Sequence, residues 1–541
     1  MKDLLAQLND LPDEILINIF KKLYNDEVLY SLMDVNKRIS KIVQDTIFTR
    51  DLYLREYFPV DDSTFPLSNP ILDRFCTQIL PEIGHKIETL YLKGTWIERV
   101  FHATNYPNLI NLGLCDIHFK LAMSLFCDKI PFPHVYKNKI TSLFINFKNE
   151  NKWIDMRVCH TMIFAQIFTI FTNLRCLKFN PYSSDLNSLY LFMTPETDIS
   201  STLLELHVTV SDIKQCLCIL DGRFDQLRIL YVIFYTTCYM PIEHTGKPLP
   251  KLRIFSLWCK DKMHNFEKSV VPLLCRMLNL EELHLNIIVQ CYEKLIDGET
   301  LRKDIVIYMP QLYKFTINIC STIYHRNQTN FPLNEHIQET FQYFPNNEII
   351  TCIDHFQEKA YSQCHIYSYP YKWEVYNNIT NNFPGGLFMS VTKVLLYDEH
   401  SFEYEFFLRI SKSFPFMRGL TINNRKAQNK KQFIKSNNDD QILSIIEYPN
   451  LQRLNLSDTH DDYVELFLFD TKIFLPNDLH ICAHYQSLKT VTHYFTRYTT
   501  GSNCVKLAAL YVDKMDQINE HIKNYFPDIC IREAIDFKLL E

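Results

Sequence analysis

Three residues near the C-terminus have the types and spacing of metal ligands. His480, Cys482 and His484 alternate along the chain. On a β-strand they would share one face, where imidazole and thiolate groups could bind zinc. A fourth ligand at a matching spacing is missing from the sequence. We therefore expect no metal and no cofactor, and we interpret the alternation as one face of a strand.

Other patterns that could support catalysis are incomplete. Cys364-His365 and Cys216-x-Cys218 are weak, because a Cys–His hydrolase needs partners that meet in space. The sequence holds no G-x-S-x-G, H-E-x-x-H, phosphate-binding loop or G-x-G-x-x-G motif. The acidic residues Asp458 to Glu465 lack the glycine of a calcium loop, so we expect them to begin a helix. These observations favour a protein that is not an enzyme.

Composition narrows the class of protein further. Apolar residues make up 47% and charged residues 22% of 541 residues, as in a folded globular protein. A formal charge of −6 gives no electrostatic footprint for nucleic acid. The longest apolar stretch, Met162 to Phe171, is too short for a membrane-spanning helix, and the N-terminus carries acids where a signal peptide would be apolar. We expect neither nucleic acid nor membrane as a partner.

The cysteines indicate the compartment. The chain has 17 of them, at scattered spacings and without a C-x-x-C motif. Isolated cysteines within apolar runs behave as small buried hydrophobic residues. We therefore expect a reducing environment, in the cytoplasm, the nucleus or both.

The first fifty residues read as three short amphipathic helices. Pro12 suits a helix start, and Asp13 and Glu14 favour the positive end of the helix dipole. Ile15, Ile19 and Leu23 then recur four residues apart. Two more apolar groups follow, around Val28 to Leu32 and Ile39 to Val43. Because a core this small is marginal alone, the helices either cap the next domain or bury part of their surface against a partner.

The segment LPDEILINIFKKLYNDEVLYSLMDVNKRISKIV closely resembles the F-box motif. It departs from the family at Asn36, where Cys is frequent, and at Ile39, where Trp is frequent. The resemblance implies docking on the Skp-family adaptor of a cullin–RING ubiquitin ligase. The residues that it assigns to the adaptor contact are Leu11, Pro12, Glu14, Ile15, Leu16, Ile19, Phe20, Leu32 and Val35.

The remainder of the chain repeats one short pattern, apolar-x-x-apolar-x-apolar. It runs from Ile87 to Ile317, resumes at Val391, and continues through Leu488/Val491 to Val512, mostly in steps of 22 to 37 residues. Proline often precedes it, as in the identical Tyr-Pro-Asn-Leu runs at Tyr106 and Tyr448. Each unit therefore reads as a helix, a proline stop, a short strand and a loop. This period predicts an irregular leucine-rich-repeat solenoid with parallel strands on its concave face and helices on its convex face.

The predicted organisation has five parts. They are an F-box at 5–52, a linker or cap at 53–85, a first part of the array at 86–320, an insertion or degenerate repeats at 321–388, and a second part of the array at 389–541. The overall fold class is α/β.

Residues between the apolar positions of each strand should face the concave surface. Mixed polar and aromatic residues there suit the recognition of a protein. As a whole the chain resembles F-box proteins with C-terminal leucine-rich repeats, the substrate receptors of Skp–cullin–F-box ubiquitin ligases. The resemblance implies that the array holds a substrate protein near the ubiquitin-conjugating enzyme, so that proximity replaces a catalytic residue. The candidate substrate-binding residues are Tyr91, His207, Tyr231, Trp258, His284, Asn286 and Tyr397.

Three alternatives stay open from the residues alone. The chain could be a leucine-rich-repeat binding scaffold without a ligase role. An enzyme site could lie within the array or between Ile317 and Val391. The basic run Arg425 to Lys435 could be a nuclear signal or a contact for an acidic partner, although a solvated loop is the simpler interpretation.

Overall fold

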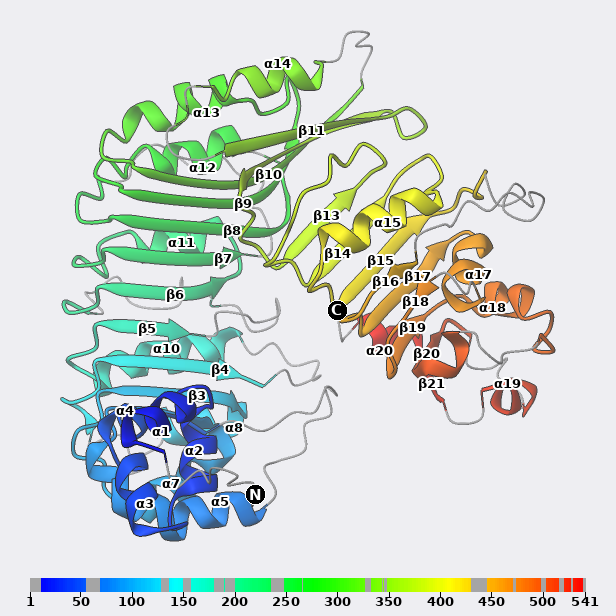
Figure 1. Cartoon of the computed structure of the whole chain (residues 1–541). Coiled ribbons are helices and arrows are strands. Elements are labelled where there is room, and N and C mark those ends of the chain that lie inside the picture. The colour runs from blue at the N-terminus through cyan, green and yellow to red at the C-terminus, as the bar shows by residue number, and fades with distance from the viewer. Residues whose placement is uncertain are drawn as a thin grey trace. The chain divides into compact units, whose positions relative to one another are not determined.

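The computed structural model of the protein divides into two compact units (Figure 1). The first comprises Met1–Val289 with Arg302–Phe315, and the second Gln290–Leu301 with Thr316–Glu541. The structure describes residues 11–54, 69–127, 136–148, 157–179, 189, 200–234, 248–264, 266–325, 332–342, 344, 348–429, 445–469, 473–497, 503–514, 520–526 and 529–538.

The first unit begins with short helices. They are α1 (Asp13–Phe20), α2 (Asn25–Leu32), α3 (Lys37–Val43) and α4 (Thr46–Thr49). Local capping fixes where two of them start, because Asn36 accepts a hydrogen bond from the Ile39 N–H at 2.8 Å and Asp45 accepts one from the Ile47 N–H at 2.9 Å. The sequence predicted the first three helices, and α4 is an addition to them.

The helices run directly into a sheet. Strand β1 (Asp51–Tyr53) follows α4 and pairs in parallel with β2 (Thr89–Lys93). The Arg50 carbonyl accepts the Glu88 N–H at 2.9 Å, and the Leu54 N–H donates to the Tyr91 carbonyl at 2.8 Å. The last residues of the predicted F-box thus form the first strand of the following domain. Of the predicted linker at 53–85, residues 55–68 lie outside the described part of the chain.

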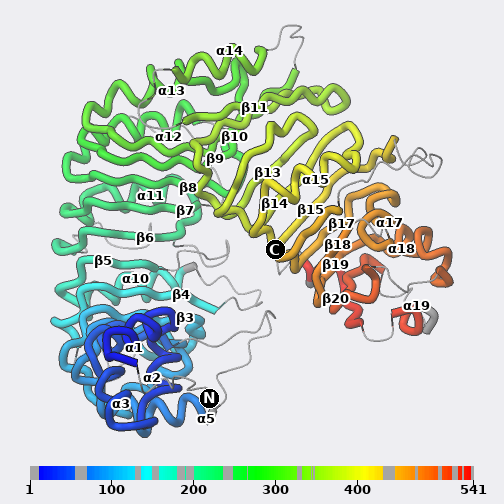
Figure 2. Tube along the Cα trace, viewed as in Figure 1, coloured from blue at the N-terminus to red at the C-terminus, as the bar shows by residue number. Residues whose placement is uncertain are grey.

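Strands β1 to β9 of the first unit lie side by side in chain order, and all of them are parallel. Figure 2 follows the chain as it returns to the same end of the sheet before each new strand. After β2 the strands are β3 (Asn111–Ile117), β4 (Ser142–Phe147), β5 (Cys176–Phe179), β6 (Glu205–Val210), β7 (Ile229–Phe234), β8 (Ile254–Met263) and β9 (Glu282–Cys291).

Helices separate these strands in the sequence and lie on one side of the sheet (Figure 1). They are α5 (Asn69–Arg74), a π-helical turn (Phe75–Ile79), α6 (Leu80–Ile83), α7 (Ile97–Ala103), α8 (Phe119–Phe126), α10 (Arg157–Ile170), α11 (Ile213–Ile219) and α12 (Phe266–Leu274). Short 3₁₀ turns occur at Gly84–Lys86 and Gly94–Trp96. Helix α13 (Gly298–Asp304) and the 3₁₀ turn Val306–Tyr308 follow β9.

Alternation along each strand explains the core of the first unit. On β2 to β9 the second and third apolar residues of each repeated unit are paired in register from strand to strand, and each has at most 1% of its surface exposed. The best example is the ladder of Leu90, Leu112, Leu143, Leu177, Leu206, Leu230, Phe255 and Leu283.

The repeated Tyr-Pro-Asn-Leu run makes the same contacts in both units. Tyr106 is buried and donates through its hydroxyl to the Val100 carbonyl of α7 at 2.8 Å, and Tyr448 does the same to the Phe407 carbonyl at 3.0 Å. Asn108 donates to the His85 carbonyl at 2.7 Å. The equivalent asparagines Asn173, Asn279 and Asn450 also donate to a backbone carbonyl before the preceding strand. Each of these asparagines joins its turn to the previous one.

The second unit contains a group of antiparallel strands and a separate parallel sheet. Strands β10 (Lys314–Tyr324), β11 (Glu348–Phe356) and β12 (Tyr361–Tyr369) are antiparallel, with β12 in the middle, and α14 (Asn334–Glu339) lies before β11. The other sheet runs in the order β13 (Val375–Ile379), β14 (Lys393–Tyr397), β15 (Gly419–Asn424), β17 (Arg453–Thr459), β19 (Leu479–Cys482), β20 (Leu507–Val512) and β21 (Cys530–Glu533), all parallel.

The remaining elements of the second unit are mostly helices. They are α15 (Tyr404–Ser413), α17 (Asp461–Phe469), α18 (Tyr485–Val491), the 3₁₀ turn Asn503–Lys506, α19 (Glu520–Tyr525) and α20 (Ala534–Lys538). Strands β16 (Ile446–Glu447) and β18 (Ile473–Phe474) form a small parallel pair.

One predicted strand is wrong. Leu488 and Val491 lie on helix α18, and the strand of that unit is β19, a few residues earlier. Both residues are buried because a helix also returns residues three apart to one face. The acidic run does begin a helix at Asp461, as expected. The predicted insertion at 321–388 contains the antiparallel strands β11 and β12 and the parallel strand β13.

Candidate protein-binding surfaces

Helix α1 has one face inside its bundle and one face outside. Leu16 and Phe20 have at most 2% of their surface exposed, and the Phe20 ring packs edge-on against Phe48 at 6.4 Å. Ile15 and Ile19, one residue earlier on each turn, are 45% and 42% exposed. The apolar stripe is therefore wider than the contact that the bundle itself makes.

The structure divides the nine predicted adaptor residues by exposure. Leu16 and Phe20 are sealed inside this chain, so they present no side-chain surface to a partner. Leu11 and Leu32 are partly buried. Exposed to solvent are Pro12, Glu14, Ile15, Ile19 and Val35. Which of the nine contact an adaptor stays a prediction.

Exposed apolar residues outside the predicted set also occur on the helical bundle. Leu23 and Tyr24 follow α1 and are 47% and 55% exposed, and Ile47 on α4 is 47% exposed. We define Ile15, Ile19, Leu23, Tyr24, Val35 and Ile47 as the apolar surface of the helical bundle. The sequence predicted that Leu23 lies on the same helix as Ile15 and Ile19, but α1 ends at Phe20 and Leu23 lies in the turn that follows. Sequence reasoning missed Tyr24 and Ile47, since nothing local shows that their side chains point outward.

Arg38 ties α3 to the start of α1. Its guanidinium donates to Asp13 Oδ1 at 2.8 Å and to the Leu11 carbonyl at 2.6 Å. Because Arg38 and Asp13 are both largely exposed, the ion pair contributes only modestly to stability. Its structural effect is to fix the direction in which the chain enters α1, and with it the place of Pro12.

The open face of the β1–β9 sheet brings several predicted substrate-binding residues into one row. Cross-strand pairs join Tyr53, Tyr91, Gly113, Phe144, Lys178, His207, Tyr231, Ser256 and His284 in register. Trp258 and Asn286 pair with one another in the neighbouring row. Four predicted residues therefore share one row, and two more lie beside it. That these residues bind a substrate stays a prediction.

The row begins with stacked aromatic rings. Tyr53 and Tyr91 stack with their centroids 4.9 Å apart, and Tyr91 and Phe144 lie 5.6 Å apart although Gly113 stands between their strands. A Cβ atom at Gly113 would overlap the ring of Tyr91. The glycine is therefore what allows Tyr91 to lie flat on the sheet and reach Phe144.

Further along the row, a carboxylate orients an imidazole against a tyrosine. His207 Nε2 lies 2.6 Å from Glu205 Oε1, and the His207 ring stacks on Tyr231 at 4.2 Å with an interplanar angle of 12°. The hydrogen bond from His207 lowers the pKa of the Glu205 carboxyl, against the opposing effect of its partial burial. Burial raises the pKa of the Tyr231 hydroxyl, and the nearby Glu282 and Glu205 add to the rise.

A carboxylate–imidazole pair recurs three strands later, on β9. His284 Nε2 lies 3.3 Å from Glu282 Oε2, which also accepts a hydrogen bond from Lys314 Nζ at 2.5 Å. Partial burial raises the pKa of Glu282, but hydrogen bonds from Lys314 and Tyr313 outweigh it and lower the pKa overall. In the neighbouring row, Lys260 Nζ lies 5.2 Å from the centre of the Trp258 ring. Sequence reasoning missed Glu205 and Glu282, although alternation puts each on the face of the histidine two residues later.

Tyr397 belongs to the second unit and has different surroundings. The Lys359 ammonium lies 4.3 Å from the centre of its ring, and Phe356 packs at 5.2 Å. Both contacts come from strand β11 and the turn that follows it. Tyr397 is half-buried by them.

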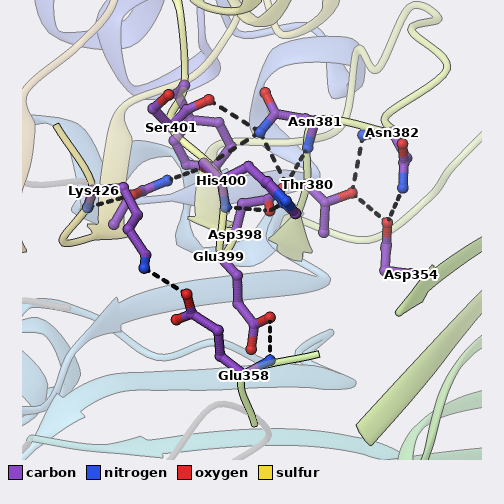
Figure 3. A network of polar contacts seen from close by, with 12 residues as sticks. Asp354, Glu358, Thr380, Asn381, Asn382, Asp398, Glu399, His400, Ser401 and Lys426 are labelled. Carbon is purple, nitrogen blue, oxygen red and sulfur yellow. Dashed lines mark hydrogen bonds and ion pairs between the residues drawn. The ribbon is translucent and has the colours of Figure 1, made fainter. Parts of the chain in front are cut away.

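Figure 3 shows a polar network at the ends of β13 and β14 in the second unit. Asp398 accepts the Asn381 N–H at 2.7 Å, and Glu399 accepts the N–H groups of Glu358 and Lys359, both at 2.9 Å. Asp354 is buried and accepts from Thr380 at 2.6 Å and Asn382 at 2.9 Å; burial raises its pKa in spite of these donors. These carboxylates are used to hold loops together.

The residues with metal-ligand spacing do not converge. His480 and Cys482 do share one face of β19, but His480 Nδ1 lies 3.2 Å from the Tyr511 hydroxyl, and His484 Nδ1 lies 2.9 Å from Asp513. Among the described residues, no three His, Cys, Asp or Glu side chains gather as a metal ion would require. Cys364 and His365 point to opposite faces of β12.

Among the residues that the structure describes, every helix is too short or too polar to cross a bilayer.

Comparison with known proteins identifies the N-terminal segment. Residues 8–55 match the family model described as F-box-like. The match covers α1 to α4 and β1, a small part of the chain. No curated protein matches the sequence. The chain therefore carries an F-box-like domain, which indicates a role in an F-box-type complex, and such domains generally bind Skp-family adaptors.

Proposed function

We propose that the protein is the substrate-recognition subunit of a Skp–cullin–F-box ubiquitin ligase. Its F-box would bind the Skp-family adaptor, and through it the cullin–RING ligase, while the open sheet face binds a substrate protein. The observation that carries the proposal is the apolar surface of the helical bundle, within a segment that matches the F-box-like family. Burial of such a surface against a partner is favourable in proportion to its area.

We also propose that both parallel sheets are leucine-rich-repeat arrays. The parallel strands in chain order, the ladders of buried leucines and the repeated Tyr-Pro-Asn-Leu contacts support this. Asn424, the last residue of β15, is buried and donates to the His400 carbonyl at 2.7 Å, which joins the end of this strand to the loop after the previous one. An array of this kind offers a broad face for binding a protein.

In this proposal the protein acts by positioning a substrate protein. Strand β1 joins the helical bundle to the β1–β9 sheet without an intervening loop, so an adaptor bound to the bundle would stand in a fixed relation to the open face of that sheet. Holding a substrate lysine near a charged conjugating enzyme raises its effective concentration. No residue of this chain would then need to be catalytic. We therefore propose that the protein is not an enzyme.

The state of the cysteines supports a proposal about the cellular compartment. The described cysteines are free thiols, and many of them are buried. We propose a reducing compartment, the cytoplasm, the nucleus or both. The partners of the proposed receptor would be proteins, with no direct role for nucleic acid or membrane.

Capture by a purified Skp-family adaptor tests the ligase proposal. The wild-type chain should be retained by the immobilised adaptor, and a chain with both Ile15→Ala and Ile19→Ala should not. If the wild-type chain fails to bind, the alternative of a binding scaffold without a ligase role replaces the proposal.

Substrate binding requires a separate experiment. Affinity purification from cells with the ligase inhibited should trap proteins that are lost with His207→Ala plus Tyr231→Ala or with Trp258→Ala. A matched control is Tyr292→Ala, because Tyr292 is 66% exposed and lies outside the two rows of the open face. Trapped proteins that are unaffected by all of these changes would show that another surface binds them.

A further inference from the structure

The residues directly before strands β5 to β8 of the first unit are rich in arginine. The Arg175 carbonyl accepts the Leu204 N–H at 2.8 Å, and the Leu204 carbonyl accepts the Arg228 N–H at 2.9 Å. The Arg228 carbonyl in turn accepts the Arg253 N–H at 2.8 Å. These hydrogen bonds place the four residues in consecutive positions along the end of the sheet where the chain enters each strand (Figure 2). Three of the four positions therefore have a guanidinium.

The turn before β4 adds two lysines at the same end of the sheet. Asn138 lies against the turn before β5, because it accepts hydrogen bonds from Thr172 and Asn173, both at 2.9 Å. Lys137 and Lys139 flank Asn138 in the sequence, and both are exposed. Arg175 and Arg228 are exposed as well. We define the basic edge of the first sheet as Lys137, Lys139, Arg175 and Arg228.

The acidic residues of the neighbouring turns already have cationic partners. These pairs are Asp221 with Arg223 at 2.9 Å, Asp225 with Lys251 at 3.8 Å, and Glu281 with Arg253 at 3.4 Å. Lys139 Nζ donates to a neutral group, the Pro107 carbonyl, at 3.2 Å. Among the described residues, no carboxylate lies within ion-pair distance of the basic edge. Its four positive charges are therefore not neutralised by the described part of the chain.

The open face beside the basic edge does not supply a counter-charge either. Glu205 lies on the strand between those that follow Arg175 and Arg228. Its carboxylate is already engaged, with Oε1 at 2.6 Å from His207 Nε2 and 3.9 Å from Lys178 Nζ. Lys178 thus offsets the charge of Glu205, and this part of the surface stays basic.

Arg228 also has a neighbour of like charge. Arg253 precedes the adjacent strand, and its guanidinium is directed to the Asn279 carbonyl at 3.0 Å and to Glu281 at 3.4 Å. Both partners belong to the turn before β9, so they lie on the side of Arg253 that is away from Arg228. Like charges at neighbouring positions of a sheet repel one another. An anion beside Arg228 would relieve this repulsion.

We propose that the basic edge binds an acidic segment of the substrate protein, with Arg175 and Arg228 contacting its carboxylates. An arginine can hold a carboxylate with two parallel N–H donors. The two arginines are two strands apart, which is roughly 10 Å, and three residues of an extended chain span that distance. The inference rests on the proposed function in assigning substrate binding to the array, and it adds the chemical class of the bound segment.

Charge favours a short acidic peptide over a long polyanion such as nucleic acid. The whole chain has a formal charge of −6, so the basic edge is a local exception on an acidic protein. A short segment meets only the attractive field of the edge, whereas a long polyanion also meets the repulsion of the remaining surface.

A fluorescently labelled decaglutamate peptide tests the proposal by anisotropy with the full-length chain at low ionic strength. The wild-type chain should bind it, and a decaglutamine peptide should not bind. Arg175→Glu with Arg228→Glu should weaken binding by about tenfold or more, because two attractive contacts become repulsive. Arg175→Gln with Arg228→Gln, which removes the charges without reversing them, should give a smaller loss.

The matched control is Lys120→Glu with Lys268→Glu. It changes the net charge by the same amount, at exposed positions of α8 and α12 on the helical side of the sheet (Figure 1). Its affinity for decaglutamate should stay within about twofold of wild type, because salt screens charges that are more than a Debye length away. Equal weakening by the two Glu double variants would show a general charge effect and overturn the proposal. Tighter binding of a single-stranded DNA of equal length at the same arginines would also overturn it, in favour of nucleic acid.

The unaltered chain provides a test that does not depend on the folding of any variant. Phenylglyoxal modifies accessible arginines, and mass spectrometry locates them. Decaglutamate should slow the modification of Arg175 and Arg228 and leave Arg302, an exposed arginine of α13, unchanged. Absence of protection, or equal protection of Arg302, contradicts the proposal. None of these measurements involves the adaptor, so their failure is distinguishable from failure of the ligase proposal.

Discussion

The double change Ile15→Ala with Ile19→Ala separates docking from folding. Full burial of an isoleucine contributes about 1.5–3 kcal/mol. Because the two side chains are 45% and 42% exposed, roughly half of that contribution remains to be gained from a partner at each position. Together the two changes should weaken adaptor binding by about 1.5–3 kcal/mol, which is about a tenfold to hundredfold rise in Kd.

Isothermal titration calorimetry with a purified Skp-family adaptor measures this effect. Thermal denaturation of the same samples should show little change in Tm, since the altered atoms face solvent. Leu16→Ala is the matched control on the same helix, because Leu16 has no exposed surface. It should lower the free energy of unfolding by about 2–5 kcal/mol through loss of core packing.

Two results would refute this reasoning. Unchanged adaptor affinity in the double variant would show that the exposed side of α1 is not part of the docking surface. A large fall in Tm in the double variant would show that Ile15 and Ile19 stabilise the bundle itself.

Three further predictions concern stability and are testable by chemical denaturation. Gly113→Ala should cost about 1–3 kcal/mol, because the new Cβ would displace the Tyr91 ring; an unchanged unfolding midpoint would contradict the stacked row. Burial lowers the pKa of His365 to about 4, so the folded chain keeps this group neutral while the unfolded chain protonates it below about 6.5. About 3 kcal/mol of stability should therefore be lost as the pH falls from about 6.5 to about 4, and His365→Gln should reduce that loss, whereas an unchanged pH profile would refute it. Asn424→Ala should cost about 1–3 kcal/mol, since it leaves the His400 carbonyl and the Lys426 N–H without the hydrogen bonds of 2.7 and 2.9 Å that Asn424 supplies; an effect below about 0.5 kcal/mol would show that water replaces them.

Much of the fold follows from short-range patterns. Apolar residues four apart gave the helices of the first fifty residues, and the spacing apolar-x-x-apolar-x-apolar gave most parallel strands. The pattern was ambiguous at Leu488 and Val491, because residues three apart also share one face of a helix. It also gave no sign of the antiparallel pairing of β11 and β12, which depends on contacts between strands.

The sequence predicted the candidate binding sites only in part. Alternation placed His207 and Tyr231 on the same side of their strands, but their stacking at 4.2 Å required the register between β6 and β7. On α1 the sequence showed a wide apolar stripe. It could not show which residues of that stripe are buried and which are exposed, because this depends on where the neighbouring helices pack.

The sequence by itself determined which side chains are apolar, how they repeat, and therefore which elements form and which face of each strand turns inward. These properties depend on residues within one or two turns of each other. Tertiary structure alone decided that Ile15 and Ile19 remain exposed, that Gly113 lets three aromatic rings meet, and that α20 covers Cys482, Ala509 and Tyr511. Each of these depends on the distance between groups far apart in the chain, which only packing and strand register fix.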